Sequence, residues 1–351
     1  MTVGAVDTGT DAGAGSVDGD LPVLVDAFGL GEVRCIRYLA EGLMNRNWRV
    51  EAGRGVFALK QIIDVPFPRA SRNLGVLGAL ATAGVPVCAP ESAMDGDLVV
   101  SVGDKGYCLF PWVDGAHLRG IDLRVDQVGA LGALLATIHQ ALGQVGTVLP
   151  ERSATVRAKV TEPDSAVAAA DRFLDHIAGI DSPRSFDLMS VRLLEQRKIL
   201  LNKYGSHRPG DEMPKGPFGW THGDMQHRNV LWRDGKVAAV LDWDRIGVRP
   251  YAEEVARTAQ VQFGGEDGRL DLERVAAFAA GYRTVIDLAE CDLADAVERL
   301  WWKRLTDYWV LEFHYDRDDH SCDDLWGPGE SLLEWWTGHR DEVQDAFATR
   351  R

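Results

Sequence analysis

One stretch in the second half of the chain constrains it most, because three polar side chains lie there between short apolar runs. They are Asp224, Asn229 and Asp242, and the apolar runs span 230–232 and 236–241. Between the runs lies Asp-Gly, a turn dipeptide that typically connects paired strands. Such a hairpin would bring Asn229 and Asp242 together at one end, beside the loop that carries Asp224. The stretch therefore predicts a metal-and-base site.

The first part of the chain predicts a small antiparallel sheet with one helix. Lys60 is set in the third strand, and a polar turn earlier in the chain carries Gly42 and Asn45. A lysine in an apolar strand is commonly an edge residue, but a glycine turn could fold over nucleotide phosphates that the lysine contacts. We therefore assign Lys60, Gly42 and Asn45 to nucleotide binding. The expected strands are 33–38, 48–51, 56–62, 98–102 and 107–111, and the expected helix spans 69–83.

The second part of the chain predicts helices, which follow from apolar residues at helical spacing. Residues 1–20 are small and polar without periodicity, so we expect a disordered tail there. We expect an N-terminal lobe over 21–110, a hinge over 111–116 and a helical lobe over 117–351. The expected helices of that lobe are 125–142, 164–179, 186–204, 250–263, 271–288, 292–315 and 329–347.

Composition excludes several classes of protein. A net charge of -15 without a long basic run argues against nucleic acid as a partner. No apolar run reaches the roughly 18 residues of a membrane span, and the first residues do not resemble a signal peptide. The five cysteines are scattered without a Cys-x-x-Cys pair, which predicts reduced thiols in a cytoplasmic protein.

The order and spacing of these polar residues carry a resemblance to a known family. Lys60 in a third strand, the run His222 to Asp224 with Asn229 following, and Asp242 after one further strand resemble the aminoglycoside phosphotransferase family. These enzymes are protein-kinase-like small-molecule kinases, and the resemblance covers roughly residues 30–290. It implies an α+β, bilobal protein-kinase-like fold: an antiparallel five-stranded N-terminal sheet with one helix, and a mainly helical C-terminal lobe.

The resemblance also implies roles for the polar residues. Asp224 would be the catalytic base that accepts or orients the proton of the substrate hydroxyl. Asn229 and Asp242 would be hard oxygen ligands of Mg2+, while the strand lysine contacts the nucleotide phosphates. His222 and Glu254 would support the catalytic loop through hydrogen bonds.

The hinge is expected to bind the purine through its backbone. If Phe110 ends the sheet, the carbonyl of Pro111 and the N–H of Val113 would face the base. Proline is compatible with that position, because only its carbonyl is used. These groups do not decide the identity of the base, so ATP is the expected donor and GTP stays open.

Two positions depart from the family pattern. Asn73 stands where such kinases carry a glutamate that pairs with the strand lysine. Lys60 would then be held by another group such as Asp242, or by the nucleotide, or phosphate positioning would be weakened. Asp244 stands where the family often has glycine, and we expect a metal neighbour, a substrate ligand or an exposed turn residue there.

The acceptor is expected to be a small molecule that binds among the C-terminal helices. Only seven residues separate Asp242 from Pro250, too few for a segment that docks a peptide. A helix near the C-terminus is rich in aromatic residues and ends in carboxylates. Such a stripe is typical of a core, yet aromatic faces beside carboxylates also suit a polyhydroxylated or amino-bearing ligand. Beside Asp244, the candidate acceptor residues are Trp302, Glu312 and Asp316.

The leading functional hypothesis is a Mg-dependent kinase of an antibiotic hydroxyl, of aminoglycoside, macrolide or nucleoside type, that gives resistance. A metabolic kinase of a sugar, amino sugar, choline or homoserine is the alternative. Asn73 motivates a third reading, a nucleotide-binding pseudokinase. A metal-dependent hydrolase would need more His and Asp ligands than the stretch provides. Either a monomer or a homodimer is compatible with the sequence.

Overall fold

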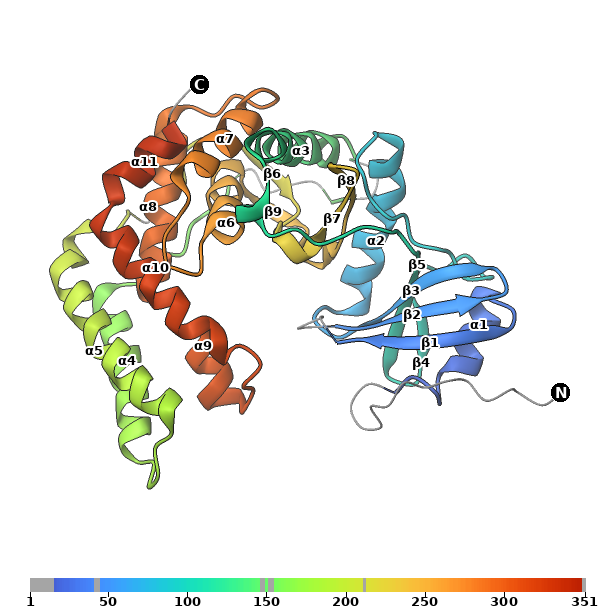
Figure 1. Ribbon diagram of the computed structural model, residues 1–351, viewed down its shortest axis with the longest axis horizontal. Coiled ribbons are helices and arrows are strands. Elements are labelled where there is room, and N and C mark those ends of the chain that lie inside the picture. Colours follow the sequence, from blue (N-terminus) through green and yellow to red (C-terminus); the bar gives the residue numbers. More distant parts are fainter. Residues whose placement is uncertain (1–15, 41–44, 146–148, 151–154, 211–212, 349–351) are drawn as a thin grey trace. The chain divides into compact units, whose positions relative to one another are not determined.

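The computed structural model describes residues 16–40, 45–145, 149–150, 155–210 and 213–348 (Figure 1). Its contacts divide the chain into two compact units, which we describe separately. The first unit comprises Met1–Leu118, Thr137–Glu151 and His222–Gly247, and the second comprises Arg119–Ala136, Arg152–Thr221 and Val248–Arg351.

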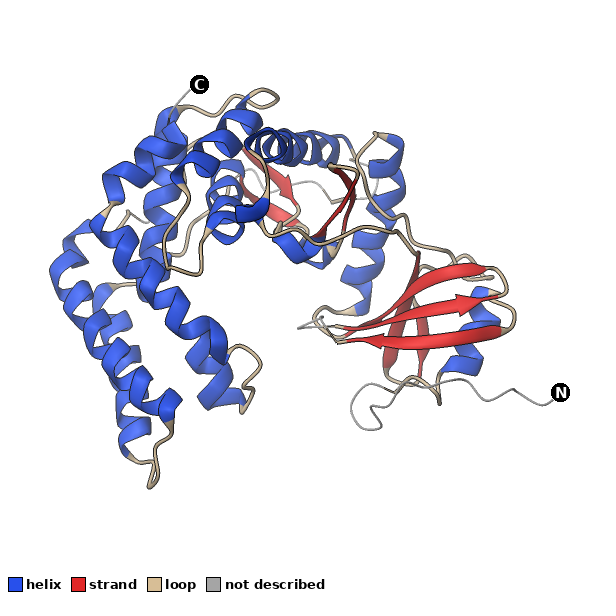
Figure 2. Cartoon of the chain, in the orientation of Figure 1, coloured by secondary structure: helices blue, strands red, loops and turns tan. Residues whose placement is uncertain are grey.

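Strands are concentrated in the first unit and helices in the second, as the colours in Figure 2 show. The strands are β1 (Val33–Leu39), β2 (Arg46–Ala52), β3 (Gly55–Ile62), β4 (Val100–Val102), β5 (Lys105–Pro111), β6 (Phe218–Thr221), β7 (Val230–Arg233), β8 (Lys236–Val240) and β9 (Gly247–Pro250). The helices are α1 (Leu21–Phe28), α2 (Phe67–Thr82), α3 (Val125–Gln144), α4 (Pro163–Ala178), α5 (Ser185–Tyr204), α6 (Tyr251–Phe263), α7 (Leu272–Arg283), α8 (Glu290–Thr306), α9 (Trp309–Leu311), α10 (Trp326–Gly338) and α11 (Arg340–Ala348).

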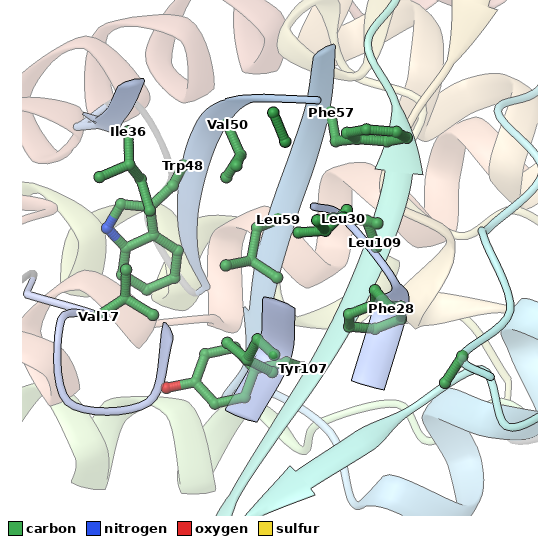
Figure 3. Close-up of a cluster of buried hydrophobic side chains, with 13 residues drawn as sticks. Val17, Phe28, Leu30, Ile36, Trp48, Val50, Phe57, Leu59, Tyr107 and Leu109 are labelled. Atoms are coloured by element: carbon green, nitrogen blue, oxygen red, sulfur yellow. The ribbon is translucent and has the colours of Figure 1, made fainter. Parts of the chain in front are cut away.

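The five-stranded sheet of the first unit has the order β1-β2-β3-β5-β4, and neighbouring strands are antiparallel. Because side chains alternate along a strand, Phe57 and Leu59 of β3 point to one face and Lys60 points to the other. The apolar face packs with α1 into a core that Figure 3 shows. Its buried members are Val17, Leu24, Phe28, Leu30, Ile36, Trp48, Val50, Ala52, Phe57, Leu59, Ala93, Tyr107 and Leu109.

Residues 16–20 differ from the prediction of a disordered tail over 1–20. That prediction is wrong for residues 16–20, and the rest of the predicted tail lies outside the described residues. Val17 is 2% exposed within the core of the sheet. The carboxylate of Asp20 accepts hydrogen bonds from Lys105 Nζ and Tyr107 Oη, at 2.8 and 2.5 Å. These bonds lower the pKa of Asp20 and tie the segment to β5.

The β7–β8 hairpin belongs to the first unit, although we expected it as an insertion in the mainly helical lobe over 117–351. The N–H of Val240 donates to the carbonyl of Pro86 at 2.7 Å. Ala116 and Trp232 exchange two backbone hydrogen bonds, at 2.8 and 2.9 Å. These long-range bonds join the hairpin to the first lobe and to the end of the hinge, which sequence order alone does not show.

The second unit is mainly helical, with the short strands β6 and β9 paired in a separate sheet that we did not predict. Its core is rich in tryptophan, and Trp301 and Trp336 are 0% and 1% exposed. Arg197 of α5 forms a buried ion pair with Glu330 of α10. In the part of the chain that the structure describes, no helix combines the length and apolar character needed to cross a membrane.

The predicted helix over 292–315 is interrupted. α8 ends at Thr306, whose hydroxyl bonds back to the carbonyl of Trp302 at 2.9 Å. Asp307 then adopts an extended conformation, and its carbonyl accepts a hydrogen bond from Arg197 at 2.6 Å. The chain resumes as α9 and a π-helical turn, Glu312–Asp316. The predicted helix over 329–347 is also two helices, α10 and α11, which meet at His339.

Candidate active site

Lys60 is the centre of a group of polar residues within the first unit. In the register of the sheet it pairs with Asn47 of β2 and Cys108 of β5, on the face opposite the apolar core. Its ammonium Nζ lies 2.9 Å from Asp242 Oδ1 and 2.8 Å from Asp244 Oδ2. One ammonium therefore faces two carboxylates.

This arrangement leaves an excess of negative charge. Burial of Lys60 opposes its charge, but the carboxylates of Asp242 and Asp244 outweigh that effect and raise its pKa. Burial favours the protonated carboxyl of Asp242 as well, yet Lys60 reverses the balance and lowers its pKa. For Asp244, burial and the charge of Asp242 prevail and raise the pKa. A further cation beside these carboxylates would therefore be favourable.

Asp244 supplies the carboxylate that the first-lobe helix lacks. It is 8% exposed, so the expectation of an exposed turn residue is wrong. Asn73 of α2 donates from Nδ2 to the carbonyls of Trp243 and Asp244, at 3.0 and 2.9 Å. The helix α2 therefore does not supply the carboxylate that pairs with Lys60. It holds the backbone of Asp244, which does.

Asn45 also holds Asp244 in place. Its Nδ2 donates to Asp244 Oδ2 at 2.9 Å, and its Oδ1 accepts from the N–H of Ile63 at 2.9 Å. Because its side chain is buried and bonded to protein through both polar atoms, we now assign Asn45 to positioning rather than to direct nucleotide contact. Gly42, the other residue assigned to that turn, lies outside the described residues.

His222 links the loop that carries Asp224 to the end of the hairpin. Its Nε2 lies 3.0 Å from the carbonyl of Leu241, and its Nδ1 accepts from the N–H of Asp224 at 3.2 Å. These contacts place the proton of the neutral ring on Nε2. Gly223 between the two residues has a φ of 88°, in the region that favours glycine.

Asn229 and Asp224 are joined directly. Asn229 Nδ2 donates to the backbone carbonyl of Asp224 at 2.8 Å and lies 3.4 Å from its Oδ2. Gln226 Nε2 donates to the same carboxylate oxygen at 3.1 Å. With its amide nitrogen so engaged, Asn229 has its amide oxygen as the atom suited to a metal ion.

Asp242 lies at the end of the hairpin in a left-handed conformation, with a φ of 57°. Such a conformation is uncommon for residues other than glycine, although Asp tolerates it better than most. The N–H of Leu241 donates to the carbonyl of Asn229 at 2.8 Å, so the two candidate metal ligands are joined through one backbone bond. Asp242 keeps 38% of its side chain exposed, and its carboxylate is a hard oxygen ligand that Mg2+ prefers. These residues fit a divalent cation.

The predicted hinge follows β5. Pro111 is the last residue of that strand and pairs with Phe57, and Val113 is half-buried. Val113 belongs to an apolar cluster that the sequence did not reveal. It combines the buried residues Cys88, Leu231 and Ala239 with the half-buried Phe110, Val113, Ala238 and Leu241. Burial raises the pKa of the Cys88 thiol to about 11, so this sulfur is neutral at physiological pH.

The candidate acceptor residues of the second unit do not form one surface. Trp302 is 1% exposed, and its Nε1 donates to the carbonyl of Thr161 at 3.0 Å, so its expected role as a ligand surface is wrong. Asp316 is paired with Arg172 through two hydrogen bonds. Glu312 is exposed in the π-helical turn, and its assignment stays a prediction.

Glu254, the expected support of the catalytic loop, is buried on α6 in the second unit. Its supporting role also stays a prediction.

The role of Asn73 can be tested by Asn73→Ala. The substitution removes two hydrogen bonds to carbonyls that hold Asp244, so we expect the free energy of unfolding to fall by about 1–3 kcal/mol. Urea unfolding measures this loss, and the KM for the nucleotide should rise because Asp244 is no longer fixed. Asn202→Ala, at an exposed position of α5, is the control: it should leave the KM unchanged and should not lower the stability, because alanine favours a helix more than asparagine does. An unchanged stability of Asn73→Ala would contradict the role.

Comparison with known proteins shows the family of this chain. The sequence profile described as "phosphotransferase enzyme family" (APH) matches residues 36–288. That range begins within β1, includes the loop that carries Asp224 and the β7–β8 hairpin, and extends through α7.

Curated relatives with detectable similarity include homoserine kinases. The homoserine kinase of Gluconacetobacter diazotrophicus is 25% identical over 284 residues, which cover 78% of this chain and 79% of that protein. The homoserine kinase of a Janthinobacterium species is 23% identical over 307 residues, which cover 85% and 87%.

Solved structures share the fold at lower identity. A spectinomycin phosphotransferase in complex with ADP and spectinomycin aligns with a TM-score of 0.58 and 14% identity, over 94% of this chain and 97% of that one. An amicoumacin kinase in complex with AMP-PNP and Ca2+ aligns with a TM-score of 0.59 and 18% identity, over 94% and 93%. At these identities the similarity establishes the protein-kinase-like fold alone.

Proposed function

The chain belongs to the phosphotransferase enzyme family, and from this premise we propose that it transfers the γ-phosphoryl group of ATP to the hydroxyl of a small amino-bearing acceptor of the homoserine class. The observation that carries the kinase chemistry is the arrangement of Lys60, Asp242 and Asp244 in the same compact unit as the catalytic loop. Phosphoryl transfer needs positioning and charge stabilisation more than covalent help from the protein.

Each polar group has a role in this proposal. Asp242 and Asn229 would hold Mg2+, which neutralises the charge that develops on the phosphates. Lys60 would bind the phosphates of the nucleotide, and Asp244 would keep its ammonium aligned. The carboxylate of Asp224 would accept the proton of the attacking hydroxyl.

The purine would contact the hinge and the apolar cluster beside it. The carbonyl of Pro111 and the N–H of Val113 would form hydrogen bonds with the base. Half-buried apolar side chains such as Phe110 and Leu241 suit the faces of an aromatic ring. GTP would place a different hydrogen-bonding edge against the same groups, so a comparison of KM values for the two nucleotides tests the preference for ATP.

Two observations support a small metabolic acceptor over an antibiotic. Homoserine kinases match over most of both chains. The aromatic stripe that suggested a platform for a polyhydroxylated ligand is largely core, since Trp301, Trp302 and Tyr308 are at most 4% exposed. The order of the two hypotheses from the sequence is therefore reversed.

A screen of acceptors with the purified protein and Mg-ATP tests this proposal. The panel contains L-homoserine, choline, short amino alcohols, amino sugars and antibiotics including spectinomycin, with ADP release and product mass as the measurements. We expect the highest kcat/KM on L-homoserine or a short amino alcohol. Turnover only on antibiotics would restore the resistance hypothesis, and nucleotide binding without transfer to any acceptor would favour a pseudokinase.

A further inference from the structure

A cluster of metal-ligating side chains lies in the second unit, in the segment that follows α9 (Figure 1). His314 belongs to the π-helical turn, His320 to the loop after it, and Asp323 begins a 3-10 turn. One ligand atom from each of the three residues lies within 4.8 Å of the others. None of them belongs to the kinase site described above.

The distances in this cluster match those between ligands of one metal ion. His314 Nδ1 lies 3.0 Å from His320 Nδ1 and 2.9 Å from Asp323 Oδ1. His320 Nδ1 lies 3.5 Å from Asp323 Oδ2. On a tetrahedral ion with bonds of about 2.0–2.1 Å, neighbouring ligand atoms lie about 3.3 Å apart. A small adjustment of the side chains would seat one ion among the three.

Hydrogen bonds alone do not account for this convergence. A ring nitrogen of histidine has one N–H or one lone pair in the plane of the ring. Yet His314 Nδ1 lies 2.9 Å from both carboxylate oxygens of Asp323 and 3.0 Å from another ring nitrogen. A single proton on His314 Nδ1 cannot form good hydrogen bonds with all three neighbouring atoms. A cation bound by all of these groups would explain why they lie so close together.

Further contacts orient the two rings as in known metal sites. The ring of His314 stacks on Phe186, with 4.1 Å between centroids and 16° between planes. The other nitrogen of His320, Nε2, lies 3.4 Å from Asp318 Oδ1. Metal-bound histidines commonly direct their second nitrogen to a carboxylate, which fixes the ring and its tautomer.

The charge of the segment also favours a cation. Between residues 316 and 324 the chain carries five aspartates and one arginine. Asp316 is paired with Arg172, while Asp318 is 97% exposed. The negative potential of the loop would attract a divalent ion.

We propose that His314, His320 and Asp323 bind one divalent transition-metal ion of the Zn2+ class. Two imidazole nitrogens and one carboxylate suit Zn2+, Co2+ or Ni2+, whereas Mg2+ and Ca2+ prefer oxygen ligands alone. Three protein ligands leave a fourth position for water, and the 57% exposure of the His320 side chain opens the site to solvent. The ion would join the π-helical turn to the 3-10 turn and fix the loop between them.

The test is a Zn2+ titration of the full-length protein after treatment with a chelator, by calorimetry in excess Mg2+. Excess Mg2+ would occupy the carboxylates proposed for the kinase site, and Asp242→Asn shows whether any Zn2+ binds there instead. We expect one Zn2+ per chain in the wild-type protein and in Asp242→Asn. Binding of Co2+ should give the visible absorption of a four-coordinate site.

Matched variants locate the ion. His320→Ala changes an exposed side chain and should weaken Zn2+ binding more than about tenfold, since even loss of a supporting partner costs about 10–100-fold. His207→Ala, an exposed histidine elsewhere in the same unit, should leave binding unchanged. Asp318→Asn suits the left-handed backbone there, with a φ of 52°, and should weaken binding by about tenfold. Equal Zn2+ affinity of His320→Ala and the wild type, or no stoichiometric Zn2+ at all, would overturn the proposal.

Discussion

Asp224→Asn is expected to lower kcat by about 10²–10⁴-fold, the contribution of a well-placed general base. The amide keeps the shape of the carboxylate but cannot accept the proton of the acceptor hydroxyl. Nucleotide binding should remain within a factor of about 3, because the proposed nucleotide and metal ligands are other residues. Steady-state kinetics on the acceptor found in the screen measures kcat, and calorimetry measures the affinity for Mg-ATP.

The loop is expected to survive this substitution. The N–H of residue 224 still donates to His222 Nδ1, and its carbonyl still accepts from Asn229 Nδ2. Asp234→Asn is the control, since Asp234 is exposed at the turn of the hairpin and has a φ of 52° that Asn tolerates. A kcat for Asp224→Asn equal to that of the control would rule out the base assignment.

Lys60→Met is the second variant with a large expected effect. It leaves the buried carboxylate of Asp244 and the partly exposed Asp242 without their cation. We expect the free energy of unfolding to fall by about 3 kcal/mol, at the low end for breaking a buried pair because Asp242 is 38% exposed. Transfer should fall by about 100-fold or more, as for loss of one group that stabilises the transition state.

The pH and Mg2+ dependence of the stability of Lys60→Met distinguishes repulsion between the unpaired carboxylates from a packing defect. Burial already raises the pKa of Asp244, and loss of Lys60 raises it further. A carboxyl with a raised pKa in the folded state stabilises the fold at low pH and loses that contribution as pH rises. The stability gap to the wild type should therefore be smaller at pH 5 than at pH 8, and Mg2+ should narrow it at pH 8.

Lys105→Met provides the matched control. Lys105 is also a strand lysine paired with one carboxylate, Asp20, but its side chain is 41% exposed. Because the ammonium of Lys105 is solvent-exposed and Tyr107 still donates to Asp20, we expect the pair to contribute about 0–1 kcal/mol, so the control should change stability little and should leave transfer intact. If Lys60→Met changed the stability and the transfer rate as little as this control, Lys60 would not be needed to balance the charges of Asp242 and Asp244.

The relation between Asn73 and Asp244 shows what sequence reasoning missed. Both departures from the family pattern were visible: an asparagine in place of a glutamate, and an aspartate in place of a glycine. Each was interpreted separately, because the two residues are 171 positions apart. Only the folded chain shows that the asparagine holds the backbone of the residue whose carboxylate reaches the lysine.

The aromatic stripe near the C-terminus shows the opposite kind of error. Its helical periodicity was more typical of a core than of a ligand platform, and its burial confirms the core. The helix break at Asp307 depends on a hydrogen bond from Arg197, 110 positions away. Local propensity cannot report a contact of this kind.

By itself, the sequence determined the family and the strands of the first unit together with its helix α2, and it supplied the candidate residues for the kinase chemistry. These features depend on local spacing, because each is a pattern within a short run of residues: the alternation of a strand, the turn dipeptide, or the loop that carries Asp224. The tertiary structure alone decided the second carboxylate of Lys60, the apolar cluster at the hinge, and the convergence of two histidines with an aspartate. Each of these depends on which side chains the packed backbone brings within bonding distance.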